Sequence, residues 1–393
     1  MVLVLIFSVT LAVAVLVSQL TQRTVLSTAV LFLVVGFLAG PKMLGLMTLS
    51  THDPAVHELA TLALFSVLFT DGMRAGLNEL RGTWKLPGRA LLFGMPLTFA
   101  AIALLARWLG GLGWTEAFLI GAVLSPTDPV FAAAIVGRSG VPARLRHLLN
   151  IESGLNDGLA LPVVVILLAV SETGQLNPAR LAGDLLAGVA LGIGAPYVFT
   201  RLERTKLFSS SVLYEPLGPF SVGLTLLAIC SVTGANEFLA AFVGGMTMAT
   251  VNPAARDAFH RFGELIAELL KLAAILAFGA LVTPSLLAGV GASGWIFALG
   301  AIILARPVAI VISLHRSSMA WREQVSAAWF GPKGFASVVY GLLVLESSIH
   351  AANRIFALTV ITVAVSMIVH SSSDIIVARW LEKDLPRGAS ESP

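Results

Sequence analysis

Apolar runs long enough to cross a lipid bilayer follow one another along almost the whole chain. A membrane-spanning helix needs about 17–25 mostly apolar residues, and about thirteen such runs can be placed. They cover roughly residues 2–20, 24–40, 58–75, 89–108, 116–137, 147–170, 181–200, 216–233, 236–250, 262–283, 291–314, 322–346 and 353–378. Only 12% of the residues are charged, against about 25% in soluble domains. The sequence therefore predicts an all-α integral membrane protein and excludes a soluble enzyme.

The Lys and Arg residues are divided unevenly between the two alternate sets of loops. Most of the 25 fall in one set, whereas the other set holds only Lys42, Arg107, Arg180 and Arg354. Because positively charged loops stay in the cytoplasm, we expect a multi-pass protein of the cell membrane, embedded in its lipid, with the N-terminus outside and the C-terminus in the cytoplasm. The net charge of +3 gives no argument for nucleic-acid binding. The single cysteine gives none for a thiolate metal site, and no cofactor is expected.

The run at 116–137 carries polar residues and prolines at its middle. Thr127 and Asp128 lie there between Pro126 and Pro129. Proline lacks a backbone donor and clashes with the preceding helical turn, so we expect the helix to break at this point. A broken backbone inside a membrane is tolerated only where it is packed in protein or lines a cavity, as in transporters.

The run at 322–346 is interrupted in a similar way by the sequence GPKG at 331–334. If six helices, a linker helix and six more follow one another, the fifth and twelfth helices are equivalent in two inverted six-helix repeats. Two crossing discontinuous helices bring half-helix ends together, and their dipoles need compensating charges. We expect Asp128 to meet the N-terminal ends, and Lys333 or Arg306 to meet the C-terminal ends.

The run at 147–170 carries Glu152, Ser153, Asn156 and Asp157 near its middle. The last three are spaced i, i+3 and i+4, so they share one face of a helix. Ionisable groups at this depth are costly and mark ion or proton pathways. A buried carboxyl group holds either a proton or, once deprotonated, a cation. Competition between the two at Asp157 is the simplest device that couples their movements.

These motifs together resemble those of the monovalent cation/proton antiporter family. Thr127-Asp128-Pro129 and the sequence ESGLND at 152–157 match the family in type, order and separation. The single Asn-Asp pair is similar to the NhaP and sodium/proton-exchanger branch, and the hydropathy pattern extends the resemblance over nearly the whole chain.

The resemblance implies one transmembrane antiporter domain over residues 1–393. Core helices at approximately 88–170 and 290–380 would carry the ion and move against scaffold and dimerisation helices at approximately 1–80 and 181–285. It also implies a homodimer formed through the scaffold.

Each polar side chain then has a candidate role. Asp157 is the expected carboxylate for the transported ion, and Asp128 and Ser153 are candidate ligands of an alkali cation. Asp128 could instead compensate the helix ends, with Thr127 supplying a carbonyl or hydroxyl oxygen. The Ser153 hydroxyl could bond back to its own helix. Asn156 is expected to orient its neighbours rather than to bind the ion.

Two further acidic residues need partners. An intramembrane Glu requires a cation, and the resemblance implies that Arg306 pairs with Glu152, with Lys333 as the competing partner. Asp71 matches an acidic position of the family, which makes it a candidate ion ligand. Arg74, three residues on, could simply pair with it at the cytoplasmic surface.

These features predict a secondary antiporter, not an enzyme, that exchanges sodium for protons by alternating access, with potassium and lithium as alternative cations. One cation for one proton is expected, because Asn156 cannot carry a second proton. A passive cation channel would be favoured by rigid carbonyl-lined filters. A proton-coupled transporter of organic anions on a similar inverted-repeat fold should offer more Arg or Lys without acidic partners.

Overall fold

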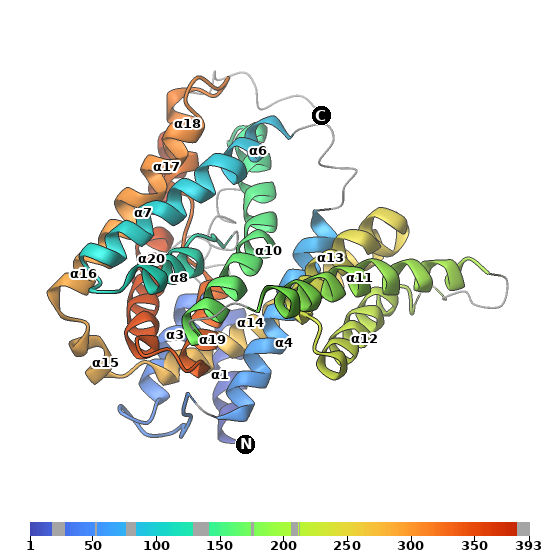
Figure 1. Ribbon diagram of the computed structural model, residues 1–393, viewed down its shortest axis with the longest axis horizontal. Helices are drawn as coiled ribbons and strands as arrows, with labels where there is room; N and C mark the ends of the chain where they lie inside the picture. The colour runs from blue at the N-terminus through green and yellow to red at the C-terminus, as the bar shows by residue number, and fades with distance from the viewer. Residues whose placement is uncertain are drawn as a thin grey trace. The chain divides into compact units, whose positions relative to one another are not determined.

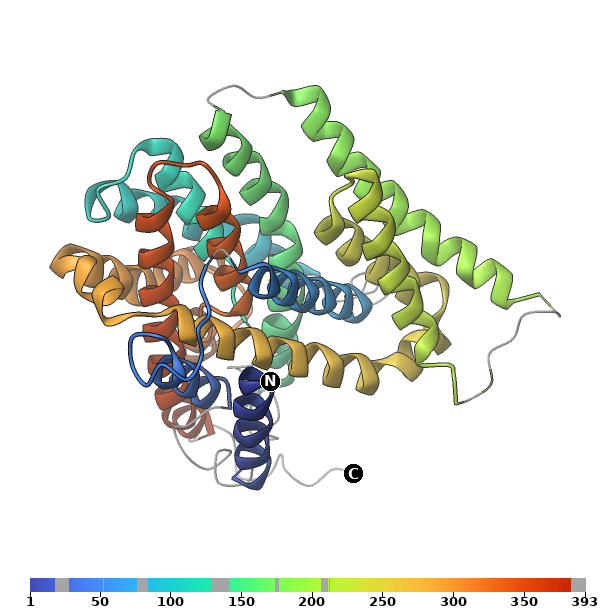
Figure 2. The same ribbon diagram turned by 90° about the horizontal axis from the view of Figure 1, so that it is seen from below.

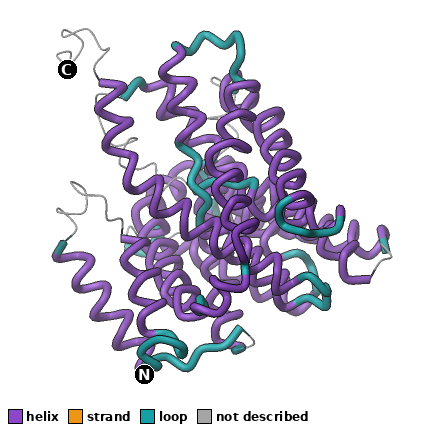
Figure 3. The backbone as a smooth tube through the Cα atoms, turned by 90° about the vertical axis from the view of Figure 1, so that its left-hand side faces the viewer, coloured by secondary structure: helices purple, strands orange, loops and turns teal. Residues whose placement is uncertain are grey.

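The regular structure of the chain is helical. The computed structural model describes residues 1–17, 28–51, 53–75, 84–128, 141–173, 177–205, 211 and 213–382, and these residues contain no strand (Figure 3). Within them, six helices are long and apolar enough to cross a membrane: Pro54–Arg74, Lys85–Trp108, Ala143–Ser171, Pro178–Glu203, Gly291–Ser313 and Ala352–Ser373. Further apolar helices are shorter, at 10–17 residues. The predicted all-α membrane fold class is confirmed.

The chain divides into two compact units. The first unit comprises Met1–Val56, Lys85–Asn156 and Leu272–Pro393, and the second comprises His57–Trp84 and Asp157–Lys271. Three helices continue from one unit into the other: α4 (Pro54–Arg74), α10 (Ala143–Thr173) and α14 (Pro253–Leu281). The predicted division into a moving core and a scaffold concerns movement, and it stays a prediction.

The first unit holds both interrupted helices. Besides parts of α4, α10 and α14, this unit contains α1 (Val2–Leu16), α3 (Thr28–Ala39), α6 (Lys85–Arg89), η1 (Ala90–Gly94), α7 (Met95–Trp108), α8 (Trp114–Leu124), α15 (Pro284–Gly289), α16 (Gly291–Gly300), η3 (Ala301–Ala305), α17 (Arg306–Ser313), α18 (Trp321–Trp329), α19 (Phe335–Glu346) and α20 (Ala352–Glu382) (Figure 1). Helix α7 packs against α17, and both α8 and α19 pack against α20. The long helix α20 therefore supports the two interrupted helices.

Two helices of the first unit contain a π-helical turn, η1 and η3. In both cases the next helix has proline at its second position, Pro96 in α7 and Pro307 in α17. Proline has no N–H to donate, which loosens the helical ladder in the preceding turn and accounts for a wide turn at this place. Turn η1 contacts α17, the helix that follows η3, and turn η3 contacts α7, the helix that follows η1.

The second unit is built around a close pair of helices. Besides parts of α4, α10 and α14, it contains α11 (Pro178–Glu203), α12 (Leu217–Thr233) and α13 (Glu237–Val251). Helix α11 lies along α13 (Figure 2). A Cβ at Gly192 would lie 2.8 Å from the Ala240 carbonyl oxygen, so glycine is required for this approach. Small residues at helix interfaces are typical of membrane proteins.

Every predicted span overlaps a helix of the structure, although some boundaries differ. The predicted start of a helix at residue 262 is wrong, because α14 begins at Pro253. The Asn252 side chain accepts a hydrogen bond from the Ala255 N–H at 3.2 Å and caps this helix. The first turns of α14 are too polar for hydropathy to identify. The count of thirteen membrane crossings and the two inverted repeats stay predictions.

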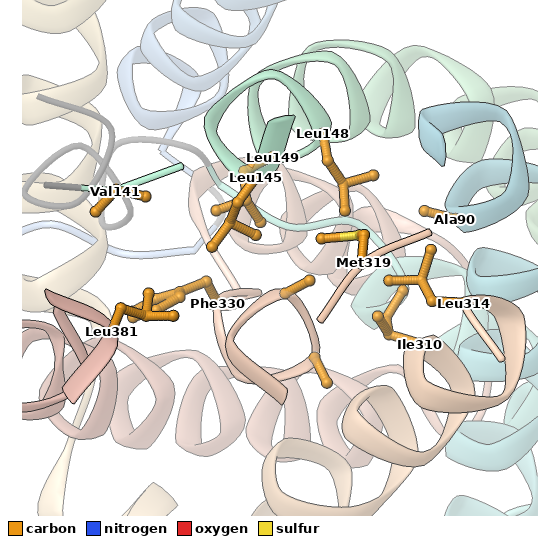
Figure 4. Close-up of a cluster of buried hydrophobic side chains, with 12 residues drawn as sticks. Ala90, Val141, Leu145, Leu148, Leu149, Ile310, Leu314, Met319, Phe330 and Leu381 are labelled. Carbon is orange, nitrogen blue, oxygen red and sulfur yellow. The ribbon is translucent and has the colours of Figure 1, made fainter. Parts of the chain in front are cut away.

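A cluster of buried apolar side chains holds α18 in the first unit. In Figure 4, Phe330, the residue that follows α18, lies beside Leu381 of α20 at one side of the cluster, and Ile310 of α17 lies at the other side. The cluster consists of Ala90, Val141, Leu145, Leu148, Leu149, Ile310, Leu314, Met319, Ala327, Ala328, Phe330 and Leu381. This packing fixes where the C-terminal end of α18 lies.

Candidate ion-binding site

Both predicted helix breaks begin where the prolines and glycines indicate. Helix α8 ends at Leu124, and the backbone from Ser125 to Asp128 is not helical. Helix α18 ends at Trp329, and α19 begins at Phe335. The second half of the predicted fifth helix, with Pro129, lies outside the described residues.

The two breaks meet at Asp128. Its backbone N–H donates to the Pro332 carbonyl oxygen at 3.0 Å, and its carboxylate accepts from the Phe335 N–H at 3.3 Å. A carboxylate at this place lies beside the positive end of the α19 dipole. A Cβ at Gly334 would overlap the Asp128 side chain. Glycine at position 334 therefore lets the charge approach the helix end.

Two buried cations meet the carbonyl ends of the half-helices. Lys333 Nζ lies 3.4 Å from the carbonyl oxygens of Ser125 and Pro126, at the end of α8. Arg306 Nη2 donates to the Phe330 carbonyl oxygen, at the end of α18, at 3.2 Å. From the sequence, Lys333 and Arg306 were alternatives for compensating the C-terminal ends of the half-helices. In the structure each of them contacts the C-terminal end of a different half-helix.

Arg306 also forms a two-point ion pair with Glu152. The distances are 2.6 Å from Nη1 to Oε1 and 3.1 Å from Nη2 to Oε2, and each side chain is 4% exposed. The partner of Glu152 is therefore Arg306, whereas Lys333 contacts backbone carbonyls. In such a buried pair, a partner left alone would be an uncompensated charge.

Asn156 connects α10 to the break after α8. Its Nδ2 donates to Thr127 Oγ1 at 2.6 Å, and both residues are 2% exposed. Among the described residues, Asn156 Oδ1 is buried with no hydrogen-bond partner. A buried oxygen without a partner costs about 1–3 kcal/mol. A bound cation or a water molecule would remove this cost, so Asn156 is a better candidate ligand than its sequence alone suggested.

Ser153 and Asp157 lie on the same face of α10 as Asn156. Both are 5% exposed, and their spacing around Asn156 follows from the continuous helix. Helix α10 therefore presents a hydroxyl, an amide and a carboxylate from one buried face. These oxygen-bearing groups suit a hard alkali cation, and their roles as ligands stay predictions.

Asp71 belongs to a group of charges in the second unit. It is 4% exposed on α4, and Arg74 Nη1 lies 3.3 Å from its carboxylate. Arg74 also pairs with Glu264 of α14 at 2.7 Å. The geometry therefore agrees with the alternative in which Asp71 pairs with Arg74. A role for Asp71 as an ion ligand stays a prediction.

Sequence analysis missed two polar residues of α20 that contact the break between α18 and α19. The Lys333 N–H donates to Ser366 Oγ at 2.7 Å, and His370 Nε2 lies 3.1 Å from the Trp329 carbonyl oxygen. A usable signal was present, because a histidine inside a membrane-length apolar run deserves a functional hypothesis, and Ser366 lies one helical turn before it.

Comparison with known proteins gives consistent matches over the chain. The model of the family described as sodium/hydrogen exchanger, transmembrane, matches residues 6–380. The K(+)/H(+) antiporter NhaP2 of Shewanella baltica (strain OS223) is 27% identical over 383 residues, which are 95% of this chain and 66% of that protein. The K(+)/H(+) antiporter NhaP of Alkalimonas amylolytica is 26% identical over 98% of this chain and 67% of that protein. The chain thus spans about two thirds of the length of these curated relatives.

A solved structure shares the fold. The sodium proton antiporter MjNhaP1 from Methanocaldococcus jannaschii, determined at pH 8, superposes with a TM-score of 0.80 at 19% sequence identity. The match covers 97% of this chain and 98% of that one. At this identity the match establishes the architecture and leaves substrate choice to the residues of the site.

Proposed function

Because the chain belongs to the sodium/hydrogen exchanger family, we propose that it is a secondary antiporter that exchanges a monovalent cation for protons. Sodium is the first cation to test. Potassium has equal claim from the curated relatives, which are K(+)/H(+) antiporters, and lithium is a further alternative. We propose a transporter and not an enzyme, because the family is one of exchangers.

The main support for this proposal is the connection between the broken helix and the polar face of α10. The break after α8 is tied through Thr127 to Asn156, and Asn156 directly precedes Asp157 on α10. A broken helix provides oxygens that no helical hydrogen bond occupies, and Asp157 supplies the charge that balances a monovalent cation. Oxygens and one titratable carboxylate on a buried helix face are what cation–proton competition requires.

In the proposed cycle, protonated Asp157 and cation-bound Asp157 alternate as the loaded forms. The cation displaces the proton because a carboxylate cannot hold both, and the loaded form then faces the other side of the membrane. Ser153, Asn156 and Thr127 are the proposed oxygen ligands. Asp128 compensates the α19 dipole and is a second candidate ligand of the cation.

The charges around the break favour a cation carrier over a carrier of organic anions. Arg306 is engaged by Glu152 and the Phe330 carbonyl, and Lys333 by the carbonyls at the end of α8. Both buried cations thus stabilise half-helix ends. An anion carrier would need such groups at its substrate.

We further propose that the protein is a multi-pass homodimer of the cell membrane, with its N-terminus outside and its C-terminus in the cytoplasm. The loop charges support this orientation. The dimer, the inverted repeats and the moving core are proposed from the family to which the chain belongs.

Proton movement in proteoliposomes tests this function. The purified protein is reconstituted with a pH-sensitive dye inside, and an outward gradient of sodium, potassium or lithium is applied in separate runs. An antiporter acidifies the lumen as the cation leaves, and the signal collapses when the cation gradient is removed. Cation efflux that proceeds with no proton movement would identify a channel and contradict the proposal.

A further inference from the structure

We propose that His370 is a positioning residue, which holds the C-terminal end of α18 at the helix crossing through a hydrogen bond from its Nε2. The consequence for transport rests on the antiporter function proposed above. The structural part of the inference stands on contacts within the first unit.

His370 lies on α20 and is 2% exposed. Its Nε2 is 3.1 Å from the Trp329 carbonyl oxygen, and Trp329 is the last residue of α18. A carbonyl oxygen only accepts hydrogen bonds. The contact is therefore a hydrogen bond when Nε2 carries a proton, as it does in the Nε2-protonated neutral ring and in the charged ring.

The other ring nitrogen connects to the far side of the break. His370 Nδ1 lies 3.1 Å from Ser366 Oγ and 2.8 Å from the Ser366 carbonyl oxygen. In the neutral ring with its proton on Nε2, the Ser366 hydroxyl donates to Nδ1 and accepts from the Lys333 N–H. A chain of hydrogen bonds then runs from Lys333 through Ser366 and His370 to Trp329. One face of α20 thereby holds both sides of the non-helical segment.

The contact bears on Arg306 through neighbouring carbonyl groups. Trp329 O accepts from His370, and the next carbonyl, that of Phe330, accepts from Arg306. Without the His370 bond, Trp329 O keeps the Gly331 N–H at 2.8 Å, and the adjacent peptide group, which carries the acceptor of Arg306, is held less firmly. His370 therefore helps to hold the guanidinium that pairs with Glu152.

A second contact keeps α18 near α20 when the imidazole is changed. Trp329 Nε1 donates to Ser373 Oγ at 2.8 Å, and this bond does not involve His370. Variants at position 370 are therefore expected to stay folded while Trp329 O loses one of its two donors, the other being the Gly331 N–H.

Two amide substitutions separate the roles of the two ring nitrogens. In His370→Gln the side-chain amide nitrogen reaches the position of Nε2, so the bond to Trp329 O is kept. In His370→Asn the shorter side chain places its nitrogen near Nδ1, so Trp329 O loses its side-chain donor and keeps the Gly331 N–H at 2.8 Å. Ser372→Ala is the matched control, because the Ser372 hydroxyl bonds within its own helix, to Ile368 O.

Hydrogen–deuterium exchange of the peptide covering residues 321–335 is measured in lipid nanodiscs for all four proteins. We expect wild type, His370→Gln and Ser372→Ala to exchange at the same rate. His370→Asn should exchange about tenfold faster, because the loss of one buried hydrogen bond raises the population of the open, exchanging state about tenfold. In proteoliposomes, His370→Asn should raise the cation KM about tenfold while His370→Gln stays within about twofold of wild type.

Equal exchange rates in His370→Gln and His370→Asn would overturn the inference. If His370→Asn does not fold, a tenfold faster exchange in His370→Gln than in wild type would overturn it. The expected exchange pattern in a protein that moves no cations would leave the positioning role intact and contradict the antiporter function. Active transport that the two substitutions affect equally would contradict the positioning role alone.

Discussion

Gly331 lies directly against the side chain of Arg306. A Cβ added at Gly331 would overlap Nε, Cδ and Cζ of that arginine. Arg306 has little freedom to move away, because Glu152 binds its guanidinium at two points and the Phe330 carbonyl binds it at a third. The glycine is therefore part of the ion pair's environment.

Gly331→Ala should destabilise the protein by roughly 1–3 kcal/mol, the usual cost of forcing an extra methyl group into a packed site. Thermal unfolding of the purified protein, followed at several denaturant concentrations, measures this loss. Gly183→Ala is the control, because Gly183 lies in α11 with no neighbour within 4 Å of an added Cβ. If both substitutions have the same effect, the contact with Arg306 does not restrict position 331.

Glu152 and Arg306 should behave as one unit in a double-mutant cycle. Removing one partner of a buried ion pair leaves an uncompensated charge and costs roughly 3–5 kcal/mol. We expect Glu152→Gln or Arg306→Gln alone to lower the melting temperature sharply, and the second substitution to add little to the first. Losses that simply add would show that the two residues stabilise the protein independently.

Asp128→Asn should weaken the crossing without abolishing it. The amide oxygen can still accept from the Phe335 N–H, but the charge that faces the α19 dipole is lost. We expect a loss of roughly 0.3–2 kcal/mol from the dipole interaction, measured by thermal unfolding. Asp128→Ala removes both the charge and the acceptor and should lose more. An Asp128→Asn protein as stable as wild type would indicate that the charge serves ion binding instead.

Exchange should be electroneutral. Asn156 does not titrate, Glu152 is bound to Arg306, and the Asp128 carboxylate accepts from the Phe335 N–H at the start of α19. The loaded carrier then has the same charge with one proton or with one monovalent cation. Exchange rates in proteoliposomes should not change when a thiocyanate gradient imposes a potential of either sign. A rate that follows the sign of the potential would show a second titrating group, with Asp128 the first to test.

Hydropathy and local motifs were sufficient to predict the helices and the breaks. A membrane-length apolar run has few alternatives to a helix, and the prolines and glycines at 126–129 and 331–334 disrupt helices by their own covalent structure. These properties reside in single segments of the chain. The polar start of α14 was missed because its cap, Asn252, is a local hydrogen bond and leaves no mark on hydropathy.

Contacts between distant segments could not be settled in the same way. The sequence left Arg306 and Lys333 as alternative partners of Glu152, because both are basic residues within apolar runs and the choice depends on packing. The contact of His370 with Trp329 joins residues 41 positions apart. The glycines at 331 and 334 were read as helix breakers, whereas their further role, room for Arg306 and Asp128, is visible only in three dimensions.

The most direct test of the proposed function is cation-driven proton movement by Asp157→Asn in proteoliposomes, beside wild type and Asp53→Asn. Asp53 caps the start of α4 through Ala55, and an Asn there changes the same chemical group away from the proposed site. We expect wild type and Asp53→Asn to acidify the lumen equally. Asp157→Asn, folded and inserted, should give no cation-dependent signal with sodium, potassium or lithium. Full cation-dependent proton movement in Asp157→Asn would contradict the assignment of Asp157 as the carboxylate for which cation and proton compete.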